Sequence, residues 1–302
     1  MKFLRFFSLI IVLFSPGLLV AQNEFPATDL YLIDIKMVKG LPTFGEAKKI
    51  TDWKGYDNQP SFTPDGKSVL YTSVRESGKA DIFRYNMEED RTTPEINTPL
   101  TAEYSPQLTP DRLNISCVRV MEDDSTQILV KFSNKDDNAT VLFPKLQPVG
   151  YYCWATNDVV AMFVLGDTST LQLGNVRTGQ IKIVGKNIGR CLQKVPNRNA
   201  FSYVQKSDDS TQWTVHTRDA ISGATATVVK CLPGTEDYCW LPDGTLLMGN
   251  GSKLYKFKPF LDKNGWVEVA DFAGTPVAKF YRIAASLKGD KLCLVSYSGE
   301  KP

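Results

Sequence analysis

Histidine is nearly missing from this sequence: His216 is the single histidine among 302 residues. One histidine cannot build a His-rich metal site, and a Ser-His-Asp triad would have to include it. The chain also has no Cys-x-x-Cys pair, no Gly-x-Ser-x-Gly elbow, and no phosphate-cradling glycine loop after a strand. We therefore expect no catalytic residue, no bound metal and no cofactor.

Clusters of basic residues are absent as well. The chain has 35 Lys and Arg against 33 Asp and Glu, a formal net charge of +2, and no stripe of cations interleaved with aromatic residues. Nucleic-acid-binding surfaces need such a concentration of positive charge. We expect no nucleic-acid partner.

The one extended apolar stretch lies at the start of the chain. Lys2 and Arg5 precede an apolar segment at residues 6–20, and residues 19–21 (Leu-Val-Ala) resemble a small-residue cleavage site. The segment is too short and too interrupted to make a good membrane span. We predict a signal peptide at residues 1–21, a periplasmic or secreted protein, and no membrane span after cleavage. The alternative is an uncleaved anchor.

Cysteine is sparse and scattered. Export and an even number of cysteines permit disulfides, but five of the six lie within predicted strands, where they would act as small buried apolar residues. One disulfide, for example Cys231 with Cys239, is the alternative. The cysteines are Cys117, Cys153, Cys191, Cys231, Cys239 and Cys293.

A short hairpin pattern recurs along the chain. Its clearest copy runs from Pro60 to Tyr71, as a strand, a Pro-Asp-Gly turn and a second strand. Proline presets φ for such a turn, and glycine takes the positive φ that it requires. Taking positions 64, 110, 156, 196, 242 and 287 as anchors, the spacings are 46, 46, 40, 46 and 45 residues. Repeats of this length built from short strands are typical of a β-propeller.

Each repeat continues with two more strands, which makes a four-stranded meander a, b, c, d. Acidic or glycine-containing turns precede the third strand, as at residues 123–126 and 167–170. We predict an all-β, six-bladed propeller. Its blades are 52–101, 102–146, 147–187, 188–232 and 233–275, and the sixth combines 276–302 with 22–51.

The Phe-Thr-Pro-Asp-Gly-Lys hairpin at residues 62–67, the period and the six copies resemble the TolB-like six-bladed propellers and their WD40-like PD40 repeats. The resemblance covers residues 22–302, which we predict to form one domain. It implies a non-enzymatic protein that recognises a partner in the cell envelope. We expect no counterpart of the N-terminal domain of TolB, because blade strands begin almost at the predicted cleavage site.

The two ends of the chain are expected to share the last blade. Residues 28–36 match the pattern of a c strand and residues 47–51 the end of a d strand, yet both precede any a–b hairpin. The final hairpin, in turn, lacks c and d strands. We predict that residues 28–51 pair with the C-terminal hairpin, which would leave no open sheet edge.

Alternating strand direction places the a–b turns on one face of the disc, and the d–a and b–c connections on the other. Five of the six d–a segments carry a tyrosine, a side chain that suits wet recognition surfaces. Packing between blades is the alternative role for these tyrosines. The candidate binding residues are Tyr56, Asp57, Tyr104, Tyr151, Tyr152, Arg190, Asp237, Tyr238, Tyr281 and Arg282.

The sequence therefore predicts an exported propeller that binds a protein, peptide or glycan partner in the cell envelope through its d–a and b–c face. The alternative is a carbohydrate-active or other hydrolytic propeller that uses carboxylates at the mouth of the central channel. The Asp-Ser-Thr turns could hold calcium, but Asp and Ser are also ordinary turn residues. The sequence sets no oligomeric state.

Overall fold

The computed structural model describes residues 25–133, 136–209 and 211–299, and every regular element in these ranges is a β-strand. The predicted signal peptide at residues 1–21 lies outside the described residues. Four antiparallel sheets have four strands each, in simple meander order. They are β8–β11 (Ala102–Leu108, Asn114–Val120, Gln127–Ser133, Asp136–Val141), β12–β15 (Val149–Trp154, Val159–Val164, Thr170–Asn175, Ile181–Lys186), β16–β19 (Ile188–Lys194, Ala200–Lys206, Trp213–Asp219, Thr225–Lys230) and β20–β23 (Tyr238–Trp240, Leu246–Asn250, Lys253–Phe257, Val267–Asp271).

The remaining strands form one nine-stranded sheet, in the order β24-β25-β1-β4-β5-β6-β7, with β2 and β3 paired to β1. Its strands are β24 (Phe280–Ala285), β25 (Lys291–Tyr297), β1 (Thr28–Val38), β2 (Leu41–Phe44), β3 (Lys48–Lys49), β4 (Tyr56–Phe62), β5 (Ser68–Val74), β6 (Ala80–Asn86) and β7 (Arg91–Ile96). A single parallel pair, Thr28 with Tyr56, connects β1 to β4.

The first and the last strand of the described chain meet in this sheet. Strand β1 runs antiparallel to β25, with Thr28 opposite Tyr297 and Asp34 opposite Lys291. The predicted d strand at residues 47–51 is shorter in the structure, where β3 covers Lys48–Lys49, and β2 adds a further partner for β1.

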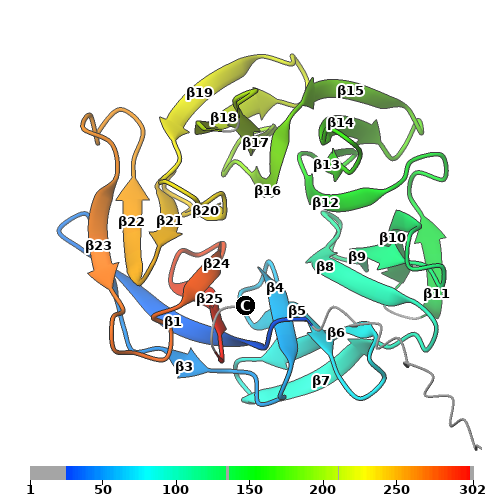
Figure 1. Ribbon diagram of the computed structural model, residues 1–302, viewed down its shortest axis with the longest axis horizontal. Helices are drawn as coiled ribbons and strands as arrows, with labels where there is room; N and C mark the ends of the chain where they lie inside the picture. The colour runs from blue at the N-terminus through cyan, green and yellow to red at the C-terminus, as the bar shows by residue number, and fades with distance from the viewer. Residues whose placement is uncertain (1–24, 134–135, 210, 300–302) are drawn as a thin grey trace, which may run out of the picture.

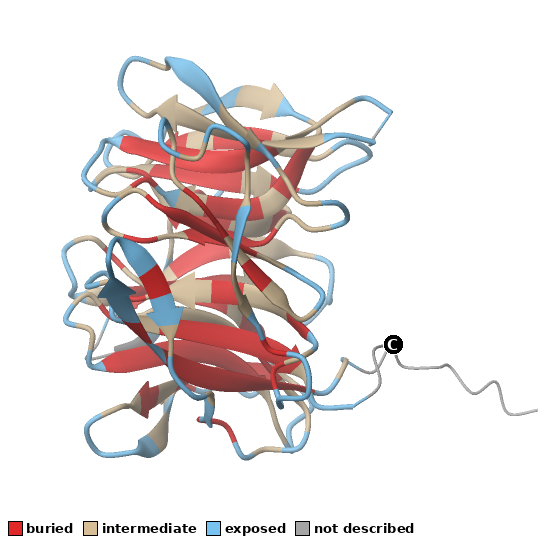
Figure 2. Cartoon of the chain, turned by 90° about the vertical axis from the view of Figure 1, so that its left-hand side faces the viewer, coloured by how far each residue is buried: buried red, intermediate tan, exposed pale blue. Residues whose placement is uncertain are grey.

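The sheets stand around a central axis (Figure 1), with β4, β8, β12, β16, β20 and β24 innermost and β7, β11, β15, β19 and β23 towards the rim. We call the innermost strands the a strands. Figure 2 shows buried residues along the middle of the strands and exposed residues in the loops of both faces.

The apolar core lies between neighbouring sheets. Val118 and Leu129 of the β8–β11 sheet pack with Val160 and Met162 of the β12–β15 sheet, and similar clusters fill the other junctions. Branched and aromatic side chains on both faces of the sheets suit this packing, because each sheet is covered by a neighbour on either side.

The Pro-Asp-Gly turns form as predicted. Gly66 and Gly244 have φ values of +71° and +83°, in the left-handed region that glycine adopts without strain. In the Pro-Asp-Arg copy at residues 110–112, Arg112 takes the same conformation, at +63°. The Thr63 hydroxyl donates to the Asp65 carboxylate at 2.6 Å, which ties the turn to its own strand.

The cysteines behave as apolar fillers. All six are free thiols, five are buried and Cys231 is partly buried, so the alternative Cys231–Cys239 disulfide is absent. Burial raises the pKa of the Cys153 thiol to about 12, which keeps it protonated at neutral pH.

Candidate functional site: the central channel

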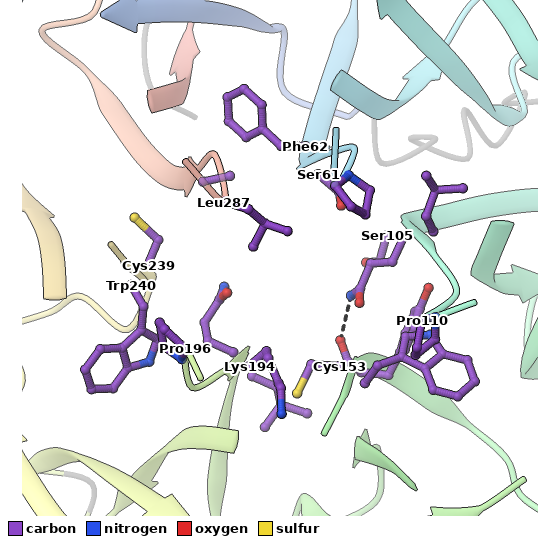
Figure 3. A pocket seen from close by; sticks show the side chains of 18 of the residues that line it. Ser61, Phe62, Ser105, Pro110, Cys153, Lys194, Pro196, Cys239, Trp240 and Leu287 are labelled. Atoms are coloured by element: carbon purple, nitrogen blue, oxygen red, sulfur yellow. Dashed lines mark hydrogen bonds between the residues drawn. The ribbon is translucent and has the colours of Figure 1, made fainter. Parts of the chain in front are cut away.

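A cavity of about 1180 Å³ follows the a strands along the central axis. Its lining comes from all six a strands and from the a–b turns that follow them, including Pro64, Pro110, Pro242 and Leu287. Figure 3 shows lining side chains, among them Pro110, Pro196 and Leu287, arranged around an open centre. The volume exceeds the 300–1,000 Å³ typical of small-molecule pockets, so the cavity has room for a larger ligand.

Three charged side chains meet in this cavity, Arg190 on β16, Arg282 on β24 and Asp237 just before β20. Arg190 Nη2 donates to Asp237 Oδ2 at 2.5 Å, and Arg282 Nε lies 3.5 Å from Asp237 Oδ1. The Arg282 and Asp237 side chains are 12% and 10% exposed, so this interaction is largely shielded from solvent. Burial is the largest effect and disfavours the charge on both guanidinium groups, but Asp237 and Tyr151 together leave their pKa above the usual value.

The second arginine is fixed further by its neighbours. Arg282 Nη1 donates to Asn58 Oδ1 at 3.1 Å, and the Asn58 amide donates to the Tyr281 hydroxyl. The guanidinium carbon of Arg282 also lies 5.6 Å from the centre of the Tyr151 ring, within range of a cation–π contact. We call Arg190, Asp237 and Arg282 the arginine belt.

The charge of the cavity wall is positive overall. Four cations line it, Arg190, Lys194, Arg198 and Arg282, against two carboxylates, Asp158 and Asp237. Asp158 is already paired with Arg177 at 3.0 Å. The sequence analysis singled out Arg190 and Arg282 but did not predict this excess of cations.

Aromatic side chains gather near the start of the a strands. Phe25 packs against Tyr56 with tilted rings whose centres are 4.9 Å apart, and its ring centre lies 6.4 Å from that of Tyr104. Tyr281 stacks on Tyr297 at 4.6 Å. Burial raises the pKa of Tyr104 to about 12, so its hydroxyl stays neutral and can donate a hydrogen bond. The sequence analysis assigned no role to Phe25. Its position just before the first predicted strand was the one feature that could have drawn attention to it.

Two of the candidate tyrosines are packing residues. Tyr152 and Tyr238 are buried, and their hydroxyls donate to Ser116 and Ser202 of the preceding sheet at 2.9 and 2.8 Å. The indole nitrogens of Trp154 and Trp240 donate to the same two serines, at 3.0 and 2.8 Å. We call each serine with its tyrosine and tryptophan a serine bracket, and each bracket joins two neighbouring sheets. Tyr152 and Tyr238 thus pack between sheets, as in the alternative role given above for the tyrosines.

Asp57 lies in the interior, away from the cavity lining. Its side chain is fully buried, and neither carboxylate oxygen has a hydrogen-bond partner of good geometry. Burial raises the pKa of Asp57 to about 6, against smaller opposing effects of Ser73, Arg75 and Thr51. An ionised Asp57 is therefore costly at neutral pH.

We expect Asp57→Asn to stabilise the protein increasingly as pH rises. The folded-state pKa of about 6 lies above the unfolded value of 3.8, so wild-type stability is lost as pH rises through the folded pKa. The shift corresponds to about 3 kcal/mol. Urea unfolding should show that the free energy of unfolding of the variant, relative to that of the wild type, is about 2–3 kcal/mol higher at pH 8 than at pH 4.5. The exposed Asp52→Asn variant should gain nothing, and equal gains in both variants would contradict the assignment.

The ten candidates thus divide into three groups. Tyr151, Arg190, Asp237 and Arg282 meet in the cavity, Tyr56, Tyr104 and Tyr281 gather near the start of the a strands, and Tyr152, Tyr238 and Asp57 serve the interior. Tyr152 also contributes to the cavity wall. The cavity reaches the a–b turns, on the face opposite to the d–a connections that the sequence favoured.

Other chemical candidates are accounted for locally. His216 lies on β18, stacks on Tyr203 at 5.8 Å, and has a pKa lowered by burial. The Asp123 carboxylate accepts hydrogen bonds from Thr126 and Ser125 in its own turn, and these bonds lower its pKa to about 2. Among the described residues, no three His, Cys, Asp or Glu side chains come together as a metal site. The same residues include no helix suited to spanning a membrane.

Comparison with solved structures identifies the fold. A protein from Agrobacterium tumefaciens described as TolB matches with a TM-score of 0.69 at 11% identity, covering 90% of this chain and 98% of that one. The fold is that of a TolB-like β-propeller. TolB from Acinetobacter baumannii matches with a TM-score of 0.59 at 12% identity, over 92% of this chain and 66% of the TolB chain, so this chain spans about two thirds of its length.

The TolB-like fold is shared by proteins with other activities. An oligogalacturonate lyase solved with manganese matches with a TM-score of 0.59 at 15% identity, covering 89% of this chain and 86% of the lyase. No protein-family model matches this sequence, and no curated protein matches it. Because these identities are low, the similarity defines the fold and leaves the function to the site.

Proposed function

We propose that this chain is an exported, non-enzymatic propeller that binds a protein, peptide or glycan partner in the cell envelope. The supporting observation is the arginine belt in the large channel. Asp237 is ion-paired to Arg190 and Arg282, so its carboxylate oxygens are already engaged by guanidinium groups. Partner contacts in this proposal include the cavity and the aromatic residues near the start of the a strands.

Glycoside hydrolysis typically requires a pair of available carboxylates flanking the scissile bond. The two carboxylates of the cavity wall, Asp158 and Asp237, are each ion-paired to arginine. The rest of the wall combines aromatic, proline and uncharged polar side chains with the four cations, a composition typical of recognition surfaces. Binding is therefore the better supported role.

The proposal includes a ring of six blades closed by the N-terminal strands. The nine-stranded sheet divides naturally at its single Thr28–Tyr56 pair, into β4–β7 and a composite blade of β24, β25, β1 and β2 with β3. With the four other sheets this makes six. Residues 1–21 act as a signal peptide in this account, and the mature protein is periplasmic or secreted.

Crosslinking in the native envelope, followed by mass spectrometry, tests the proposed function. A tagged chain should recover a reproducible envelope partner, and the purified protein should turn over no member of a glycan panel that includes oligogalacturonates. Glycan turnover together with recovery of no partner would overturn the proposal.

A further inference from the structure

We propose that one edge of the ring docks on a membrane surface that carries anionic lipid headgroups. The contact is made by the β1–β2 turn (residues 36–41) and the β22–β23 loop (residues 258–265), which we call the apolar tips. Neither tip belongs to the channel lining, so this inference goes beyond the proposed function and does not depend on it.

Both tips project on the face that carries the a–b turns, on either side of β23. Strand β1 runs four residues past Asp34, its last partner for β25, and there pairs with β2, so the turn extends about 13 Å further along the strand. Strand β2 packs against β23, with the Phe44 and Phe272 rings 6.5 Å apart. The second tip leads directly into β23, and Lys258 Nζ donates to Asp243 of an a–b turn at 2.7 Å. Figure 1 shows both tips on the left of the ring.

The second tip holds an aromatic side chain out in solvent. Phe260 is 96% exposed and Leu261 is 69% exposed. Phe260 has a φ of +69°, which is uncommon for a bulky residue. The Asp262 carboxylate fixes this loop, because it accepts from Lys258 N at 2.6 Å and from the largely buried Lys256 Nζ at 2.9 Å. A side chain that is already held in place loses little freedom when it enters a lipid surface.

The first tip adds three apolar side chains. Met37, Val38 and Leu41 are each about half exposed, and Lys39 and Gly40 form the turn between them with φ values of +51° and +80°. Single exposed apolar residues need no explanation. Five of them on two tips that flank one strand indicate an interaction site.

The charge of the tips favours an anionic lipid surface as the occupant. Lys36, Lys39 and Lys263 are exposed, and within the described part of the chain none of them is ion-paired. Apolar side chains flanked by lysines are typical of segments that lie at a membrane interface, where the ammonium groups reach the headgroups. Three carboxylates beside the tips are each paired to another lysine, as Asp34–Lys291, Asp243–Lys258 and Asp262–Lys256.

Co-sedimentation with lipid vesicles tests this inference on the full exported chain. Vesicles of phosphatidylcholine with about 30% phosphatidylglycerol should bind the chain roughly 10- to 100-fold more tightly than vesicles of phosphatidylcholine alone, because each lysine near an anionic surface adds to the affinity. Sodium chloride at about 0.5 M should remove most of this difference.

Two multiple variants separate the apolar contribution from that of charge. Phe260→Ser with Leu261→Ser should weaken binding to the phosphatidylglycerol vesicles by roughly tenfold or more. Lys36→Gln with Lys39→Gln and Lys263→Gln should remove most of the preference for phosphatidylglycerol.

Matched controls make the same kinds of change elsewhere. Leu113→Ser removes an exposed leucine from an a–b turn of another sheet, and it should bind vesicles as the wild type does. The charge control removes three exposed lysines of the outer strands β15 and β19, and it should keep the preference for phosphatidylglycerol. Its substitutions are Lys182→Gln, Lys186→Gln and Lys230→Gln.

A tryptophan placed at the second tip reports insertion directly. In Phe260→Trp the added fluorescence should be quenched when brominated phosphatidylcholine is mixed into the phosphatidylglycerol vesicles, and in Leu113→Trp it should not.

The outcomes decide between a lipid and a protein at the tips. Binding that both tip variants weaken and both controls retain supports the lipid surface. Sedimentation with neither kind of vesicle, or an equal loss in Leu113→Ser, would overturn it, and binding that ignores lipid charge would overturn the anionic headgroups. If vesicles do not bind and the tip variants instead lose a protein recovered by crosslinking in the envelope, the tips dock on a protein and the lipid surface is wrong.

Discussion

A chain without residues 22–51 will not unfold in a single cooperative transition. The deletion removes β1, whose side chains join two parts of the core. Leu30 and Leu32 pack in the cluster with Val69 and Tyr71, whereas Tyr31, Ile33 and Ile35 pack in the cluster with Leu247 and Leu254. Burial of five such side chains contributes roughly 8–15 kcal/mol, as much as the whole stability of a typical domain.

Urea unfolding followed by tryptophan fluorescence measures this effect. The matched control is a circular permutant that places residues 25–51 after Gly299. The two segments already lie side by side as antiparallel strands, and Ser298 N donates to the Ala27 carbonyl at 3.0 Å. The permutant should recover one cooperative transition. A sharp transition near the wild-type midpoint in the deleted chain would contradict the composite blade.

Ser202→Ala should destabilise the protein by about 2–4 kcal/mol. The Ser202 hydroxyl accepts from Tyr238 Oη and from Trp240 Nε1, so its removal leaves two donors without a partner, one of them fully buried. Thermal and urea unfolding measure the loss. Ser116→Ala should give a similar loss in the second bracket, and Ser77→Ala, at an exposed turn, should give almost none.

Tyr238→Phe in the Ser202→Ala background separates the bracket from a general packing effect. The phenylalanine removes the unpaired hydroxyl, so the double variant should lose less than the sum of the two single variants. Simple additivity, or a loss in Ser202→Ala no greater than in Ser77→Ala, would show that the bracket does not stabilise the junction between sheets.

The strands could be predicted from sequence because their signals are local. The Pro-Asp-Gly turn at residues 64–66 imposes a hairpin whatever surrounds it, and its recurrence at a steady spacing indicates repeated sheets. Pairing of residues 28–36 with the last hairpin could also be predicted, since one segment lacked exactly the strands that the other supplied. The structure pairs Thr28–Asp34 with Lys291–Tyr297.

The site was less accessible to the same reasoning. The repeat aligns Tyr152 and Tyr238 with the other candidate tyrosines, but their side chains turn to Ser116 and Ser202 between sheets. That choice depends on a serine 36 residues earlier, and no local pattern reveals it. The arginine belt likewise joins residues that lie on or next to the strands of three sheets, so its ion pairs depend on how the sheets are arranged and not on any one motif.

Site-specific photocrosslinking tests the central claim, that the channel is where the partner binds. A photoreactive amino acid at Leu287, a cavity residue that is 64% exposed, is compared with one at Ile183, which is 61% exposed on the outer strand β15. In the native envelope the probe at Leu287 should form a discrete adduct that Arg190→Gln diminishes, and the probe at Ile183 should form none. An adduct at Ile183 alone, or none at either position, would contradict the account.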